Sequence, residues 1–200
     1  MNNTIGLINY GIAGNTHSIK KAIEKAGGTV KVVNSKEELE SVNKIVIPGV
    51  GSFKDAMQEL ENDGLLEPLK IAITTKPTLG ICIGMQILSS IGFEYGKTEG
   101  LNAIQAEVKP ILVDAKVPHV GFNSIKVVTP NKLLAGLENE EFYFMHSYEV
   151  VNYTDISALT DYAGHMFVSS VQKSHLYGVQ FHPEKSREAG INLFKNFIAL

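Results

Sequence analysis

The chain has 200 residues, of which 44% are hydrophobic and 20% are charged, and its formal net charge is −3 at pH 7. This composition is ordinary for a soluble globular protein, and it leaves no basic surface for nucleic acid and no polybasic patch for a membrane. A single cysteine excludes an internal disulfide framework, and no apolar run approaches the ~20 residues that span a bilayer. The first residues lack the features of a secretory signal. We therefore expect a cytoplasmic protein that forms one domain over residues 1–200.

The first half of the chain alternates short apolar segments with amphipathic ones. A glycine-bearing loop over 11–15 follows the first strand, and Ser35 and Ser52 begin capping sequences at the starts of two helices. This alternation is typical of a parallel sheet with helices on both faces. The pattern predicts strands at 4–8, 29–33, 44–47 and 78–81, helices at 17–26, 53–61 and 65–74, and a short helix after residue 35.

The second half contains more strands and fewer helices, which indicates an antiparallel or mixed extension of the sheet. We predict a flavodoxin-like fold, in which a mixed, mostly parallel sheet carries helices on both faces. In such open sheets, functional sites lie at the carboxyl ends of the strands. The expected elements here are strands at 106–112, 124–128, 142–145, 165–170 and 177–181, and a closing helix at 191–198.

The only cysteine lies in the sequence Gly80-Ile81-Cys82-Ile83-Gly84, between the strand at 78–81 and a predicted helix that begins at 85–89. Glycines on both sides of a nucleophile, at a turn from strand to helix, are typical of a nucleophile elbow. The turn strains the central residue, and the helix start favours a thiolate. Free cysteines are more often small buried hydrophobes. The setting nevertheless makes Cys82 a candidate nucleophile.

A histidine and a glutamate follow the strand predicted at 177–181, in the sequence His182-Pro183-Glu184. A thiolate nucleophile needs a base to carry protons, and the base needs a carboxylate that fixes its tautomer. A histidine at a strand end beside a solvated glutamate is also common without any function. His182 and Glu184 become candidates because the chain also offers Cys82.

The third candidate segment is Pro48-Gly49-Val50-Gly51-Ser52-Phe53, directly after the strand at 44–47. A cysteine that attacks a carbonyl needs N–H donors for the developing oxyanion. The backbone of Ile83 supplies one donor, and Gly49 and Gly51 allow this loop to turn a second one inward. A simple turn is the alternative. A phosphate-binding loop is disfavoured because the lysine and spacing of a P-loop are missing.

These motifs together resemble the class I, or triad, glutamine amidotransferases. Within that family the chain is similar to the glutaminase subunits of imidazole glycerol phosphate synthases. The resemblance covers essentially the whole chain. The narrower similarity rests on the loop at 48–53, on Pro118-His119-Val120-Gly121-Phe122-Asn123, on His146-Ser147-Tyr148 and on the segment 178–186.

The resemblance implies roles for individual residues. Cys82 would be the nucleophile, His182 the general acid and base, and Glu184 its orienting carboxylate. Oxyanion donors would come from Val50 and Ile83. L-glutamine would be held by Gly49, Gly51, Gln86, His146, Ser147 and Tyr148.

The resemblance also implies a partner. Members of this branch form a heterodimer with a cyclase subunit, a (β/α)8 barrel, and pass ammonia to it through a tunnel for histidine biosynthesis. It implies no organic cofactor and no metal, and the histidines show no ligand spacing supported by nearby carboxylates.

Two segments depart from the family pattern. The first loop reads Asn9-Tyr10-Gly11-Ile12-Ala13-Gly14-Asn15, with asparagine for the usual aspartate and one extra residue, and Phe122 replaces a tryptophan. Both departures concern the partner surface. A paralogous subunit that supplies ammonia for sugar amidation in surface glycans is therefore an alternative. So are a free-standing cysteine amidohydrolase or peptidase, and a degenerate regulatory domain, which the intact triad disfavours.

Overall fold

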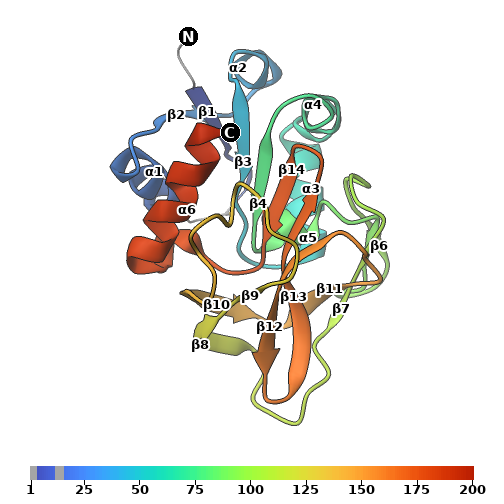
Figure 1. The fold of residues 1–200 in the computed structure, drawn as a ribbon. Helices are drawn as coiled ribbons and strands as arrows, with labels where there is room; N and C mark the ends of the chain where they lie inside the picture. Colours follow the sequence, from blue (N-terminus) through green and yellow to red (C-terminus); the bar gives the residue numbers. More distant parts are fainter. Residues whose placement is uncertain (1–3, 12–15) are drawn as a thin grey trace.

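The computed structural model describes residues 4–11 and 16–200 (Figure 1). Most of the loop expected at 11–15, including its extra residue, lies outside the described residues. The structure combines one large sheet with helices on both faces and two smaller sheets, which lie together beyond one end of it (Figure 1).

The large sheet has eight strands in the order β2-β1-β3-β4-β14-β13-β12-β9. The five strands from β2 to β14 are parallel, whereas β13, β12 and β9 extend the sheet in antiparallel fashion. The parallel part has the strand order of flavodoxin-like sheets, so the predicted fold class is confirmed. The bounds are β1 (Thr4–Ile8), β2 (Thr29–Val33), β3 (Lys44–Ile47), β4 (Thr78–Ile81), β9 (Lys126–Val127), β12 (Ile156–Tyr162), β13 (His165–Lys173) and β14 (Leu176–Val179).

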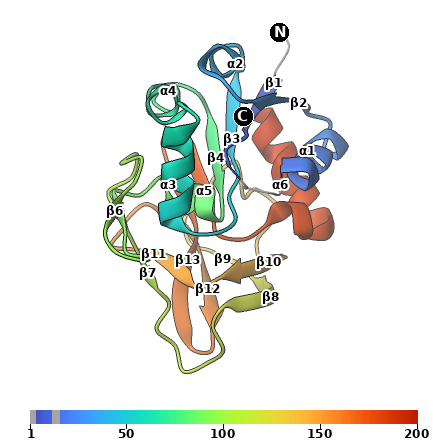
Figure 2. The same cartoon turned by 180° about the vertical axis from the view of Figure 1, so that it is seen from behind.

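Helices cover both faces of the parallel part. Figures 1 and 2 show α1 (Thr16–Lys25) and α6 (Arg187–Ala199) on one side, and α3 (Phe53–Asn62) and α4 (Leu66–Ala72) on the other. The short α2 (Lys36–Glu40) packs against α4. Every residue of β3, β4 and β14 is buried, because these central strands have neighbours on both edges and helices on both faces. No helix among the described residues is long and apolar enough to cross a membrane.

The two smaller sheets adjoin the ends of β4 and β14. One pairs β8 (His119–Ser124) with β10 (Glu141–His146). The other has the order β11-β7-β5-β6, with bounds β5 (Ile91–Gly92), β6 (Thr98–Glu99), β7 (Glu107–Pro110) and β11 (Tyr148–Val151). A bridge between Tyr143 of β10 and His182 joins the first of these sheets to the chain that leaves β14. The carboxyl ends of the central strands are thereby covered.

Several predicted bounds differ from the structure. The strand expected at 177–181 ends at Val179, because the chain then crosses from the large sheet to β10. The strand expected at 124–128 is divided between β8 and β9. The helix expected over 85–89 is α5 (Ile83–Gln86). It stops there because the carbonyls of residues 87–89 accept hydrogen bonds from the segment 101–104.

Candidate active site

Cys82 occupies the turn between β4 and α5. Its φ of 54° and ψ of −111° lie outside the regions that non-glycine residues normally adopt, so the surrounding structure must hold a strained backbone. Its N–H donates a hydrogen bond to the carbonyl of Val179 at 2.8 Å. Its carbonyl accepts hydrogen bonds from Met85 and Gln86 at 3.0 and 3.1 Å. The main chain therefore fixes the elbow on both sides.

The glycines that flank Cys82 are required by close backbone approaches. A Cβ atom on Gly80 would lie 2.5 Å from the carbonyl oxygen of Gly84. A Cβ atom on Gly84 would overlap the carbonyl oxygen of Ile47, at the end of β3. The steric reason for these glycines, inferred from the sequence, is confirmed.

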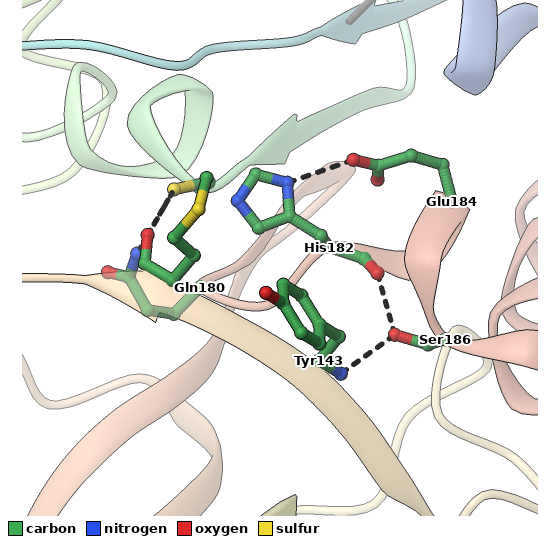
Figure 3. A network of polar contacts seen from close by, with 7 residues as sticks. Tyr143, Gln180, His182, Glu184 and Ser186 are labelled. Atoms are coloured by element: carbon green, nitrogen blue, oxygen red, sulfur yellow. Dashed lines mark hydrogen bonds and ion pairs between the residues drawn. The ribbon is translucent and has the colours of Figure 1, made fainter. Parts of the chain in front are cut away.

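His182 lies beside the elbow, and hydrogen bonds hold both its ring and its main chain (Figure 3). Its Nδ1 is 2.9 Å from Oε1 of the buried Glu184. Its N–H donates to the carbonyl of Tyr143 at 2.8 Å. The Ser186 hydroxyl donates to the carbonyl of His182 at 2.6 Å and accepts from the N–H of Tyr143 at 2.9 Å. The imidazole is thus fixed from two elements.

The free side of the imidazole faces the candidate nucleophile. Since Nδ1 donates to Glu184, Nε2 is the nitrogen left for proton transfer, and it is buried without a hydrogen bond to another described residue. Burial by itself lowers the pKa of His182, but the negative charges of Cys82 and Glu184 outweigh it and raise the pKa to about 10. The imidazolium form of His182 is therefore favoured at neutral pH.

The loop after β3 packs against the elbow. The buried Tyr10 donates its hydroxyl to the carbonyl of Pro48 at 2.6 Å, which fixes the loop from the end of β1. Of the two glycines, only Gly51 has a left-handed backbone, with φ at 101°. Gly49 is needed for another reason: a Cβ atom there would lie 2.6 Å from the Cβ atom of Ile83. The loop therefore depends on the backbone freedom of glycine at Gly51 and on the absence of a side chain at Gly49.

A cavity of about 140 Å³ lies between the elbow, this loop and the start of β11. It brings together most of the residues expected from the sequence, whereas Gly49 and Glu184 lie behind the lining, against Ile83 and His182. The cavity is lined by Val50, Gly51, Cys82, Ile83, Gln86, Glu94, Pro118, Met145, His146, Ser147, Tyr148 and His182.

Two polar side chains of the lining, Gln86 and His146, both contact the main-chain carbonyl of Tyr148. Gln86 donates from Nε2 to the carbonyl of Tyr148 at 3.1 Å, while its Oε1 is buried with no partner among the described residues. His146 faces the same carbonyl through Nδ1 at 2.9 Å. Burial lowers the pKa of His146 to about 3, so its ring is neutral. The lining residues therefore include a buried amide oxygen without a partner among the described residues and an uncharged imidazole.

Glu94 is a lining residue that the sequence did not single out. It is 8% exposed, and its Oε2 accepts a hydrogen bond from the N–H of Phe53, at the start of α3, at 2.7 Å. Burial raises the pKa of Glu94, and this hydrogen bond offsets the effect in part. No motif marks Glu94, because it lies in a connection between two very short strands.

The aromatic position that departs from the family pattern lies near the site. Phe122 is 38% exposed, and its ring packs edge-on against Tyr143 at 5.5 Å and under the guanidinium of Arg187 at 4.5 Å. Phe122 thus retains an aromatic surface on β8. The neighbouring strand β10 is the one whose Tyr143 carbonyl accepts the hydrogen bond from the His182 N–H.

The described residues include no group of three or more His, Cys, Asp or Glu side chains arranged to hold a metal ion. What the cavity does contain is a buried thiol on a strained elbow, an imidazole with a bonded carboxylate, and a glycine loop packed against the elbow. This combination suits nucleophilic attack on a carbonyl or amide carbon.

Comparison with known proteins defines the class. The family described as "Glutamine amidotransferase class-I" matches residues 7–200, and the chain belongs to this family. Solved structures agree on the fold. A structure described as glutamine amidotransferase covers 98% of this chain and 99% of its own, with a TM-score of 0.77 at 17% identity. PurLQS from Thermotoga maritima covers 100% and 99%, with a TM-score of 0.72 at 17% identity.

Closer relatives point to one branch of the class. The chain is 43% identical to the imidazole glycerol phosphate synthase subunit HisH 1 of Campylobacter jejuni (strain RM1221), over 98% of this chain and all of the relative. It is 42% identical to the subunit HisH of Desulfitobacterium hafniense (strain DSM 10664 / DCB-2), over 96% and 92% of the two chains. The resemblance inferred from the motifs is confirmed.

Proposed function

We propose that this chain is the glutaminase subunit of an imidazole glycerol phosphate synthase. In this role it hydrolyses L-glutamine to glutamate and ammonia as one amidotransferase domain over residues 1–200. The similarity to HisH subunits over nearly the full chain supports the assignment. The observation that carries the chemistry is the cavity in which Cys82 and the free Nε2 side of His182 meet.

We assign the reaction to a Cys82–His182–Glu184 triad. The Cys82 thiolate attacks the side-chain amide carbon of glutamine, and His182 gives its proton to the departing ammonia. His182 then takes a proton from water, which attacks the thioester and releases glutamate. Glu184 keeps Nδ1 bonded, so that Nε2 remains the working nitrogen. The raised pKa of His182 supports its role as the proton donor in the first step.

The oxyanion of each tetrahedral intermediate requires N–H donors. We assign these to the main chain of Ile83, the first residue of α5, and of Val50, in the loop after β3. Gly49 allows the two segments to approach, because any side chain there would collide with Ile83. The Tyr10–Pro48 hydrogen bond limits how far this loop can move.

We assign recognition of the glutamine to the remaining lining residues. The free Oε1 of Gln86 suits an N–H donor of the substrate, and Gly51, His146, Ser147 and Tyr148 complete the walls. Glu94 provides a carboxylate in a largely buried position. It suits the α-ammonium group of the amino acid, because buried charges are stable only when they are paired.

This role for Glu94 predicts a change in substrate affinity. The Glu94→Gln variant is expected to raise KM for glutamine by about tenfold or more with a smaller change in kcat, because a charge-assisted hydrogen bond is lost. Steady-state glutaminase assays with the cyclase present measure both constants. Glu99→Gln, on the exposed surface of β6, is the matched control and should leave KM unchanged. An unchanged KM in Glu94→Gln would remove this residue from the binding site.

We propose that the ammonia acceptor is a cyclase subunit with a (β/α)8 barrel, bound as a heterodimer in the cytoplasm. The names of the relatives support a partner, since each is called a subunit of a synthase. Ammonia released without a partner is lost to water, so activity should depend on the complex. The loop at 48–53 is a suitable switch, because Gly51 can change its backbone dihedral angles at little cost.

The complex provides the test of the proposed function. The purified chain alone is expected to hydrolyse glutamine very slowly. Adding the histidine-pathway cyclase, with its substrate or an analogue, should raise kcat by orders of magnitude, as followed by glutamate release. Full activity of the isolated chain would instead indicate a free-standing amidohydrolase. Activation only by a barrel that acts on a sugar would assign the chain to glycan amidation.

A further inference from the structure

Gln180 is a fully buried side chain next to the nucleophile, and the assigned triad does not use it. It follows the end of β14 by one residue and is 0% exposed. Its Nε2 lies 3.6 Å from Sγ of Cys82, within hydrogen-bonding distance for a sulfur acceptor. Figure 3 shows Gln180 and Glu184 on opposite sides of the His182 ring. The reacting sulfur therefore has a neutral amide and, at 4.0 Å, the main-chain carbonyl of Met145 close to it, as well as the imidazole.

A second glutamine determines which way this amide points. Gln86 uses its Nε2 to donate to the carbonyl of Tyr148 at 3.1 Å and to Oε1 of Gln180 at 3.0 Å. A carbonyl accepts hydrogen bonds only, so the Gln86 atom that faces it must be the amide nitrogen. Oε1 of Gln180 then receives the second proton of Gln86, and Nε2 of Gln180 is left to face the sulfur. The main-chain carbonyl of Tyr148 thus fixes the orientation of both amides.

We propose that Gln180 is a further catalytic residue, whose amide N–H donates to Sγ of Cys82, stabilises the thiolate and holds the sulfur in place for attack. The inference rests on the proposed function in one respect, the assignment of Cys82 as nucleophile. Hydrogen bonds to a charged acceptor are stronger than those to a neutral one, so the donor favours the thiolate over the thiol. Because the amide is neutral, this bond stabilises the thiolate without using the His182 proton.

The same chain of hydrogen bonds connects the cavity wall to the sulfur. Oε1 of Gln86 lacks a partner among the described residues, and Gln86 lines the cavity. Its nitrogen is bonded to Gln180, which is bonded to Cys82. A substrate N–H that binds Oε1 of Gln86 polarises the amides in series, because linked hydrogen bonds strengthen one another. A substrate bound in the cavity would thereby strengthen the hydrogen bond from Gln180 to the sulfur of Cys82.

Other ionisable groups also affect the thiolate, and a test must separate them from Gln180. Each belongs to a different element around the cavity, so a neutral substitution at 180 leaves all of them in place. These groups are His182 with its bonded Glu184, Tyr10 after β1, His146 at the end of β10 and Glu94 after β5.

The test measures alkylation of the thiol as a function of pH. Cys82 is the only cysteine, so the rate of iodoacetamide modification of the full chain reports on this sulfur alone. Removing the donor in Gln180→Met should move the midpoint of the pH profile upward and slow alkylation below it about ten- to hundredfold. Gln180→Glu keeps the shape and the acceptor for Gln86 but places a negative charge beside the sulfur. Its midpoint should move further upward.

Ser169→Ala is the matched control, because it removes a fully buried hydroxyl from the neighbouring strand β13. Its alkylation profile should match the wild type, and melting temperatures should show whether each variant is folded. If Gln180→Met does not fold, Gln180→Leu, which also removes the donor without adding a charge, takes its place. A folded variant at position 180 with a wild-type midpoint would overturn the proposal. The alkylation assay needs no glutamine, so shifted midpoints in a chain that lacks glutaminase activity even with the cyclase and its substrate present would refute the proposed function and leave this donor role standing.

Discussion

The Cys82→Ala variant is expected to lose glutamine turnover by about 10⁴-fold or more, because no other residue can form the thioester. The assay must include the activating cyclase, so that the wild-type rate is high enough for the loss to be measured. A glutamine analogue that carries a chloroketone should label the wild-type chain once, at Cys82, and should leave the variant unlabelled.

Binding provides the control for this variant. Alanine tolerates the elbow backbone as well as cysteine does, so Cys82→Ala should remain folded and should still bind glutamine in a calorimetric titration. A variant that binds glutamine and still turns it over at the wild-type rate would show that Cys82 is not the nucleophile. A variant that unfolds should be replaced by Cys82→Ser, which keeps the side-chain shape.

The second large effect concerns the two partners of the nucleophile. His182→Asn should lower turnover by about 10²- to 10⁴-fold, because proton transfer to the departing ammonia fails. Glu184→Gln should lose less, since the base itself remains. The carboxylate of Glu184 raises the pKa of His182. Its removal should therefore move the alkaline limb of the pH profile of kcat/KM toward lower pH.

The double variant distinguishes a triad from separate contributions. Residues that act as one unit give strongly non-additive losses, so His182→Asn combined with Glu184→Gln should be little slower than His182→Asn alone. Lys185→Gln changes a neighbouring charge on the same 3-10 turn and should leave the alkaline limb in place. Wild-type rates for both single variants would contradict the triad.

Much of the parallel sheet can be predicted from the sequence, because its strands are short, continuous apolar runs between helices. The predicted bounds of β1, β2, β3 and β4 agree with the structure. The smaller sheets are harder to predict. The strands β5 and β6 each contain two residues, too few for a periodic pattern. The strands β11 and β12 were also missed, and so was β8 apart from its last residue.

In the candidate site, too, residues that belong to a local sequence motif can be predicted, whereas residues placed by contacts far apart in the sequence cannot. Cys82, His182 and Glu184 carry local motifs, so the sequence indicates them directly. Glu94 and Gln180 acquire their places through contacts with Phe53 and Gln86, which lie far away along the chain. The sequence contained Gln180 within the His182 motif, but only the folded chain shows that its amide faces the sulfur.

The hydrogen bonds around Ser186 have a mechanical consequence. One hydroxyl joins the main chain of Tyr143 to that of His182, and a direct bond between the same two residues stands beside it. These bonds form a stiff joint between the β8–β10 ribbon and the segment that carries the imidazole. A molecule that binds at Phe122 and shifts the β8–β10 ribbon would therefore also shift the imidazole of His182, because these three hydrogen bonds couple the two segments.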